Sequence, residues 1–154
     1  MKLNEIKIDN QTGIGQVPDN TNVDYLGLRV LMKPSQFLKL AHDVIVPKQS
    51  KEHIKAAIQG GAAIGAPFLN IDIPKEWRDN DMSIAAHVIS HEGRHRMMAV
   101  KELAGDIPLE VHLFFRGGIR NRHLKPEWIK NMQSRLIPQW GEIPLDGPWF
   151  EVMT

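Results

Sequence analysis

The residues best suited to chemistry in this chain lie together between His87 and Arg96, where histidines and arginines surround one glutamate. His91, Glu92 and His95 have the spacing of the HExxH pattern, in which two histidines one helical turn apart bind zinc and the glutamate activates water. The same residues also form the run Glu92-Gly93-Arg94-His95-Arg96, which is typical of a tight turn that opens a helix. The free N–H groups and the dipole at a helix N-terminus favour anions such as phosphate.

The two interpretations need different backbones at Gly93. A zinc site requires one continuous helix, although glycine inside a helix costs about 1 kcal/mol relative to alanine. The apolar residues before His91 have the composition of a strand, whereas those after Arg96 have helical spacing up to a stop at Gly105. The sequence therefore favours a strand, a turn at Gly93 and a helix, with a zinc hydrolase as the weaker alternative and zinc an improbable cofactor.

Composition predicts one ordinary α/β domain. The chain has 154 residues, a formal net charge of +1 and no cysteine. The lack of cysteine excludes disulfides, thiolate metal sites and a cysteine nucleophile. No apolar run approaches the length of a membrane span and no secretory signal opens the chain, so we expect a cytoplasmic protein without membrane contact. With so little net charge, any binding of nucleic acid must come from a local patch.

The apolar spacing predicts an α/β (α+β) fold, in which a small mixed sheet has flanking helices and a C-terminal helical extension. Strands are expected at 25–32, 67–74, 82–90 and 109–115. Helices are expected from Pro34, from Ser50 as N-cap to Gly60, from the Gly93 turn to Gly105, and from Pro126. We expect residues 1–24 to be a flexible arm, 25–115 a core, and 116–154 a basic loop, helix and tail packed on that core. Alternation places Arg29 toward solvent.

This order of elements, together with the Glu-Gly-Arg-His-Arg run, resembles the ParB/sulfiredoxin superfamily over roughly residues 25–115. Short matches at Met32 (Met-Lys-Pro-Ser), near Leu124 (Leu-x-Pro-Glu) and near Leu136 (Leu-Ile-Pro-Gln) look like features of ParB-related domains from phages and plasmids. In that superfamily a Gly-x-[His/Arg]-Arg box opens a helix whose N-terminus holds nucleotide phosphates. The resemblance thus implies a nucleotide-binding protein of a mobile element.

Carried over residue by residue, the resemblance assigns phosphate binding to Gly93, Arg94, His95 and Arg96. It also assigns polar contacts to Ser50 and Lys51, which open the helix opposite the box. Glu92 matches the acidic residue that precedes this glycine in archaeal free-serine kinases, so Glu92 and His95 are the expected catalytic residues. Glu92 would act as a general base or bind Mg²⁺ together with ATP or CTP.

Two departures limit this transfer. ParB has its glutamate after the glycine, where this chain has Arg94, so the CTP chemistry of ParB does not follow directly. Sulfiredoxin needs a cysteine at the same position, and this chain has none. Reduction of sulfinic acids is therefore excluded.

A second candidate site lies in the basic segment from Arg116 to Arg135, which contains six lysines and arginines and one acid. Its default interpretation is a solvated face. A contact with nucleic acid would use the Gly117-Gly118 pair, with Trp128 or Trp140 stacking on a base and cations on the phosphates. The cations predicted to do this are Arg116, Arg120, Arg122 and Lys125.

The leading hypothesis is a phage- or plasmid-type protein that binds a nucleotide or a nucleic-acid phosphate at the Gly93 turn. Phosphotransfer, nucleotide hydrolysis and nuclease activity all fit, and the sequence does not choose among them. An alternative is a non-catalytic module that binds DNA or a protein and acts on a host complex. The expected partners are thus a nucleotide, DNA or a host protein.

Overall fold

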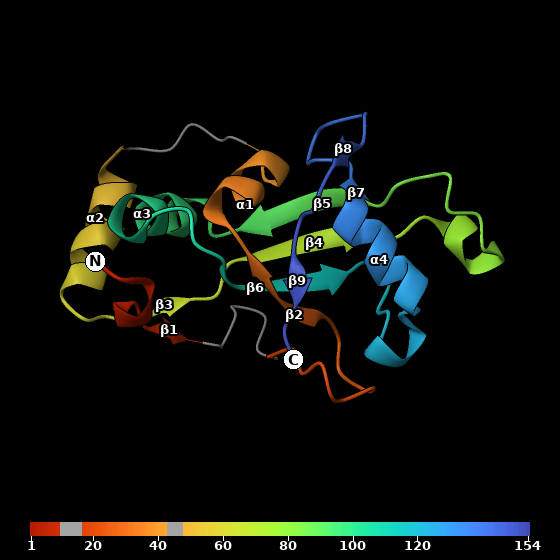
Figure 1. Cartoon of the computed structure of the whole chain (residues 1–154), viewed down its shortest axis with the longest axis horizontal. Coiled ribbons are helices and arrows are strands. Elements are labelled where there is room, and N and C mark those ends of the chain that lie inside the picture. Colours follow the sequence, from red (N-terminus) through yellow and green to blue (C-terminus); the bar gives the residue numbers. More distant parts are fainter. Residues whose placement is uncertain (10–16, 43–47) are drawn as a thin grey trace.

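The computed structural model describes residues 1–9, 17–42 and 48–154, and its centre is one five-stranded mixed sheet (Figure 1). The strand order is β5-β4-β6-β2-β9, in which β4 and β6 are the only neighbouring strands that run parallel. This architecture confirms the predicted α+β class. The strands of the sheet are β2 (Leu28–Met32), β4 (Phe68–Asp72), β5 (His87–Glu92), β6 (Leu109–Phe115) and β9 (Glu151–Val152).

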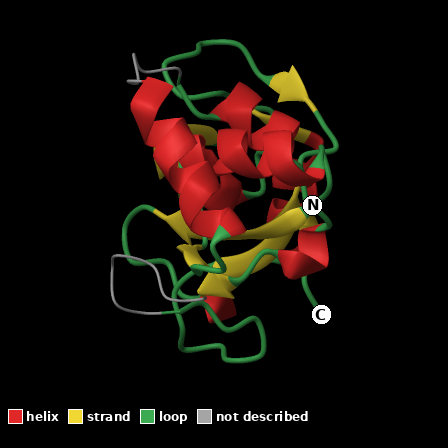
Figure 2. Cartoon of the chain, turned by 90° about the vertical axis from the view of Figure 1, so that its left-hand side faces the viewer, coloured by secondary structure: helices red, strands yellow, loops and turns green. Residues whose placement is uncertain are grey.

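Among the described residues, four α-helices accompany the sheet, and most of the helical turns lie over one of its faces (Figure 2). Helix α3 packs beside both α1 and α2. Several of the apolar residues that the helical spacing predicts to face the core are fully buried; Phe37, Leu40, Met97 and Val100 are completely inaccessible, whereas Leu103 is only partly buried. The helices are α1 (Pro34–Leu40), α2 (Lys48–Gln59), α3 (Arg94–Ala104) and α4 (Pro126–Ser134).

The N-terminal residues lie closer to the core than the expected flexible arm. Ile6 is buried, and β1 (Ile8–Asp9) pairs in parallel with β3 (Ile64–Gly65). Further along, the Asn20 side chain donates to the carbonyl oxygens of Arg29 and Met153, both at 2.8 Å. Residues 10–16 of the expected arm lie outside the described residues. The remaining short helix at this end is η1 (Leu3–Glu5).

The second face of the sheet is also covered, which simple alternation does not predict. His112 is completely buried, and Phe114 and Phe68 meet edge to face at 5.6 Å. Arg29 does not simply face solvent, because its Nη2 donates to Glu110 at 2.8 Å and its side chain is 31% exposed. Glu110 Oε2 also lies 2.7 Å from His112 Nε2. Burial raises the pKa of Glu110, but its hydrogen bonds to His112 and Arg29, together with their charges, lower the pKa by more, so the net shift is downward.

Other boundaries differ slightly from the prediction. The strand before the Gly93 turn begins at His87, not Met82, and α2 begins at Lys48, so Ser50 lies inside the helix instead of capping it. After α4 the chain forms β7 (Arg135–Leu136), β8 (Leu145–Asp146) and β9, and β9 is an edge strand of the central sheet. Two 3-10 helices, η2 (Lys75–Asp79) and η3 (Asn121–His123), follow β4 and β6. None of the described helices is long and apolar enough to cross a membrane.

Candidate phosphate-binding site

The backbone changes from strand to helix at Gly93. β5 ends at Glu92, Gly93 has φ 113° and ψ 15°, and α3 begins at Arg94. A Cβ atom at residue 93 would lie 2.6 Å from Pro67 Cβ and 2.9 Å from Pro67 Cα. Glycine is required here both by its left-handed φ and by this close approach.

This geometry removes the helix on which the HExxH interpretation depends. His91 lies on the strand and His95 in the first turn of the helix, so the two imidazoles are not stacked one helical turn apart. His91 Nδ1 instead hydrogen bonds to Gln139 Oε1, and its ring meets Phe37 edge to face. Within the described ranges, no group of three or more histidine, cysteine or acidic side chains is arranged to hold a metal ion.

Arg94 joins two helices. Its Nη1 donates to the carbonyl oxygens of Leu38 at 2.9 Å and Ala41 at 3.0 Å, at the end of α1. Those carbonyls have no partner within the helix itself, so the guanidinium acts as a C-terminal cap for α1. The structure thus gives Arg94 a role in packing α1 against α3, which the resemblance did not suggest.

Arg96 is held at the floor of a cleft. Its Nη1 donates to the carbonyl oxygen of Gly65 at 2.7 Å, and its Nη2 lies 3.7 Å from Glu92 Oε1. The Arg96 side chain is 19% exposed, whereas that of Glu92 is 62% exposed. Burial lowers the pKa of the guanidinium and the charge of Glu92 partly offsets this effect, so Arg96 is a partly desolvated cation.

The cleft has a volume of about 310 Å³ and lies between α2, β3 and the Gly93 turn. The first turn of α3 begins at this cleft, and the N–H groups of a first helical turn have no partner within their own helix. A second hollow next to it shares His53, Ile54 and His95 and adds Ser50. The cleft is lined by His53, Ile54, Ala57, Ile64, Glu92, Gly93, His95 and Arg96.

His95 is the most unusual group in the cleft. Its Nε2 is buried and, within the described part of the chain, has no hydrogen-bond partner. Burial is the main cause that lowers the pKa of His95, followed by the charges of Arg94 and Arg96. The imidazole is therefore neutral near pH 7, with a polar nitrogen that an incoming ligand could satisfy.

The two predicted residues of α2 have different roles. Ser50 lines the adjoining hollow, but Lys51 Nζ pairs with Glu102 on α3 at 2.5 Å, as does Lys55 at 2.8 Å. These two ammonium groups lower the pKa of Glu102 to about 2. Lys51 therefore ties α2 to α3. Sequence reasoning missed His53, although its position three residues after Ser50 places both on one helical face.

The predicted nucleic-acid contacts lie elsewhere. Arg116, Arg120, Arg122 and Lys125 follow β6, whereas the Gly93 turn follows β5, which runs in the opposite direction.

Comparisons of the chain with protein-family models, curated proteins and solved structures find no match. The site is accordingly interpreted from its own geometry.

We expect the pKa of His95 to lie below the ordinary histidine value of about 6.5 and to rise when a phosphate ligand binds, because an adjacent anion favours the imidazolium. In the ligand-free protein the unfolded chain binds this proton more readily than the folded chain does, so lowering the pH below about 6.5 should lower stability. Histidine proton shifts followed by NMR against pH, with His95→Gln for assignment, measure the pKa with and without the ligand. An unshifted pKa that ignores the ligand would contradict them.

Proposed function

We propose that this chain is a ParB/sulfiredoxin-like protein that binds a nucleotide through its phosphates at the cleft beside Gly93. The observation that carries the proposal is the first turn of α3. There the start of the helix, the His95 side chain and the Arg96 cation line one cavity, and the buried Nε2 of His95 has no partner among the described residues. Each of these features favours a bound anion, and together they match the chemistry of phosphate recognition.

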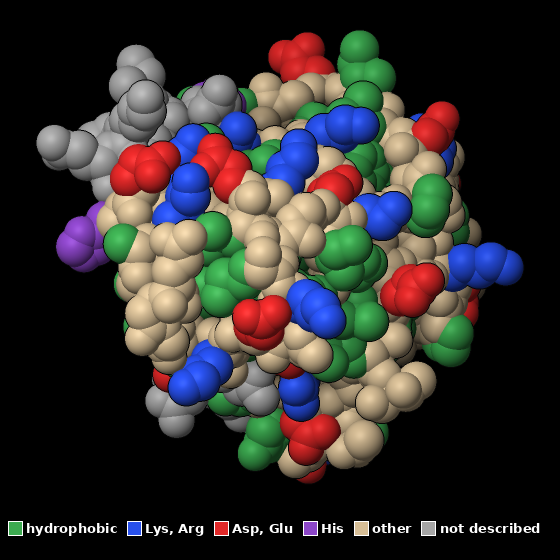
Figure 3. Space-filling model, turned by 60° about the vertical axis from the view of Figure 1, so that its left-hand side comes forward, with side chains coloured by type: hydrophobic (Ala, Val, Ile, Leu, Met, Phe, Trp, Pro, Cys, Tyr) green, Lys and Arg blue, Asp and Glu red, His purple; other side chains and the backbone are tan. Residues whose placement is uncertain are grey.

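The cleft fits a small phosphorylated molecule better than a polymer. Its volume of about 310 Å³ is at the small end for ligand sites. Figure 3 shows acidic and basic side chains interspersed over this end of the molecule, without a broad field of one sign. A nucleotide would place its phosphates on the helix terminus and its remaining atoms against Ile54, Ala57 and Ile64 of the apolar wall.

Glu92 and His95 are the residues proposed to carry any reaction. Glu92 is exposed at the cleft, 3.7 Å from Arg96, and its carboxylate can accept a proton from a hydroxyl or bind the Mg²⁺ that accompanies a nucleotide. His95, being neutral, can donate to or accept from an oxygen of the ligand. Arg94 is left out of the proposed ligand contacts because it caps α1.

Calorimetric titration with ATP and with CTP, with and without Mg²⁺, tests the proposal. Arg96→Ala and His53→Ala should each weaken binding by about 10- to 100-fold, as expected for the loss of one charge-assisted contact. Lys39→Ala, an exposed cation on α1, is the matched control and should bind as the parent chain does. His53→Ala is needed because Arg96 also holds Gly65, so Arg96→Ala could act through the fold.

A measurement of turnover separates an enzyme from a non-catalytic binding module. Glu92→Gln should leave affinity measured without Mg²⁺ nearly unchanged and abolish release of phosphate or transfer to a hydroxyl, if the site is catalytic. Binding without turnover in the parent chain would favour the non-catalytic module. If neither nucleotide binds, or if both cleft variants bind as Lys39→Ala does, the proposed site is wrong.

A further inference from the structure

A second and larger cavity lies at the other end of the sheet. It has a volume of about 620 Å³, within the range typical of organic ligands. It is not part of the cleft beside Gly93, since the two share no residues. The second cavity is lined by Arg78, Gly117, Gly118, Ile119, Arg122, His123, Lys125 and Trp128.

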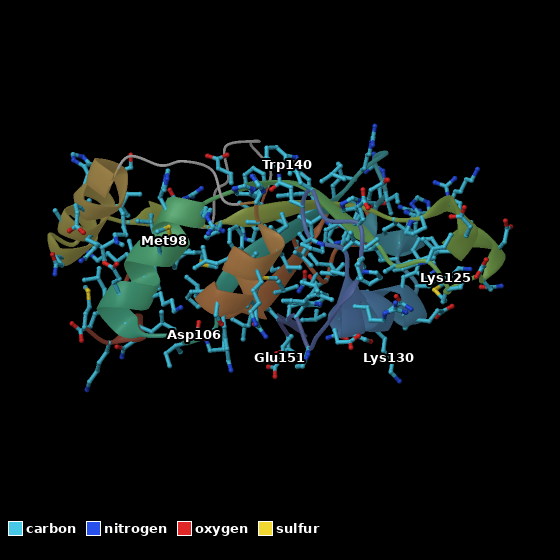
Figure 4. All side chains as sticks on the ribbon, turned by 90° about the horizontal axis from the view of Figure 1, so that it is seen from above. Met98, Asp106, Lys125, Lys130, Trp140 and Glu151 are labelled. Atoms are coloured by element: carbon cyan, nitrogen blue, oxygen red, sulfur yellow. The ribbon has the colours of Figure 1, made fainter. Side chains whose placement is uncertain are left out.

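The direction of the strands explains why these distant residues meet. β4 and β6 are parallel, so the segments that follow them, η2 with Arg78 and the Gly117-Gly118 loop, leave the same end of the sheet. β5 is antiparallel to β4 and delivers the Gly93 turn to the opposite end. In Figure 4, Met98 on α3 and Lys125 at the start of α4 mark these two ends.

The second cavity is strongly cationic. Arg78, Arg122 and Lys125 line it, and the exposed Arg116 precedes its two glycines. Arg122 forms an ion pair with Asp24, and Arg120 Nη1 donates to the carbonyl oxygen of Asp24 at 2.6 Å, so these two predicted contacts also hold the loop in place. Arg78 was not predicted from the sequence because it lies some forty residues before the basic segment.

The floor of the second cavity combines free donors with an apolar wall. Gly117 and Gly118 have φ of 88° and 67°, and their N–H groups donate no hydrogen bond to the part of the chain that the structure describes. Ile119 and Trp128 form the wall, and Lys125 Nζ lies 5.7 Å from the centre of the Trp128 ring. Trp128 is only 4% exposed, so it cannot provide the open stacking platform predicted for it.

We propose that the second cavity binds one nucleotide unit of a single-stranded nucleic acid. Arg78 and Lys125 hold the phosphate, the Gly117-Gly118 backbone approaches it closely, and the sugar and base lie against Ile119 and the edge of Trp128. Arg116, outside the cavity, then meets the phosphate of a neighbouring nucleotide.

A strand of nucleic acid accounts for these features better than an acidic peptide does. The carboxylates of an acidic peptide would pair with the cations. They would leave a cavity of this volume, and its apolar wall, unused. A cation outside the cavity, beyond those that line it, suits a ligand that carries a phosphate on every unit.

Fluorescence anisotropy of a labelled 20-nucleotide single strand of mixed sequence tests the proposal. Arg78→Ala and Lys125→Ala should each weaken binding by about 10-fold in low salt and reduce its dependence on salt concentration. The matched control is Lys39→Ala, which removes an exposed lysine from α1 and should have no effect. His53→Ala, in the cleft beside Gly93, should also leave affinity for the strand unchanged, which separates this test from that of the nucleotide site.

Three competitors distinguish the sources of the anion. An unlabelled single strand should displace the probe, whereas polyglutamate of equal charge and a free nucleoside monophosphate should do so only at far higher concentration. Displacement by polyglutamate as effective as by the strand would overturn the proposal, as would binding of the monophosphate without the strand. Equal losses of affinity in Lys39→Ala and Arg78→Ala would overturn it too, since they would indicate diffuse charge.

Discussion

Replacing Gly93 with valine should lower the free energy of unfolding by about 3 kcal/mol or more, because two separate penalties act at this position. A β-branched residue at φ 113° is strained wherever it lies. In addition, the new Cβ would stand 2.6 Å from Pro67 Cβ and 2.9 Å from Pro67 Cα, atoms that cannot rotate away. Relief therefore requires a shift of β4 or of the start of α3, and with it the N–H groups of the cleft.

Urea unfolding at constant pH measures the loss, and Gly61→Ala provides the matched control. Gly61 also has a left-handed φ, 87°, but a Cβ there meets nothing within 4 Å. It should cost only about 1–2 kcal/mol, the penalty for an alanine in that conformation. If Gly93→Ala, which adds only the Cβ, proved no worse than Gly61→Ala, the contact with Pro67 would not constrain the turn.

Replacing Trp77 with alanine should cost about 3–5 kcal/mol of stability, the usual range for deleting a buried tryptophan. Trp77 is completely buried in η2, its ring lies 6.1 Å from that of Trp128, and its Nε1 donates to the carbonyl oxygen of Ile84 at 2.7 Å. It thereby fixes the segment that presents Arg78 to the second cavity. We expect Trp77→Ala to weaken binding of the single strand as well, even where the chain remains folded.

The control is Trp140→Ala, which removes the same side chain from a position that is 72% exposed. Its loss should be much smaller, since exposed side chains contribute little to the hydrophobic free energy. Trp77→Phe should recover part of the stability, although it leaves the carbonyl of Ile84 without its donor. A loss in Trp77→Ala no greater than in Trp140→Ala would show that η2 is not anchored in this way.

The sequence predicted the backbone around the site well because its signals there are local. Gly93, the apolar run before it and the helical spacing after it together specify a strand, a turn and a helix without reference to the rest of the chain. The bounds of β6 were predicted to the residue, since alternation and flanking prolines and glycines coincide at Leu109 and Phe115. Elements of two residues, such as β7 and β9, carry too little periodicity to be found.

Side-chain roles were harder to predict because they depend on partners far along the chain. Arg94 meets the end of α1 some fifty residues earlier, and Lys51 meets Glu102. Nothing local distinguishes such an arginine from Arg96, which borders the cleft. His112 likewise falls on the polar side of an alternating strand, yet it is buried because a second layer of residues covers that face.

Both edges of the sheet are closed by residues that follow its four other strands in the chain. Val88 N–H donates to Ile137 and Ile137 N–H to Ala86, both at 2.9 Å, while β2 is flanked by Glu151 and Val152. A nascent chain that has emerged only as far as β6 therefore has its four inner strands but two bare backbone edges. Such edges pair with strands of other molecules. Residues 135–152 therefore also limit self-association of the chain during synthesis.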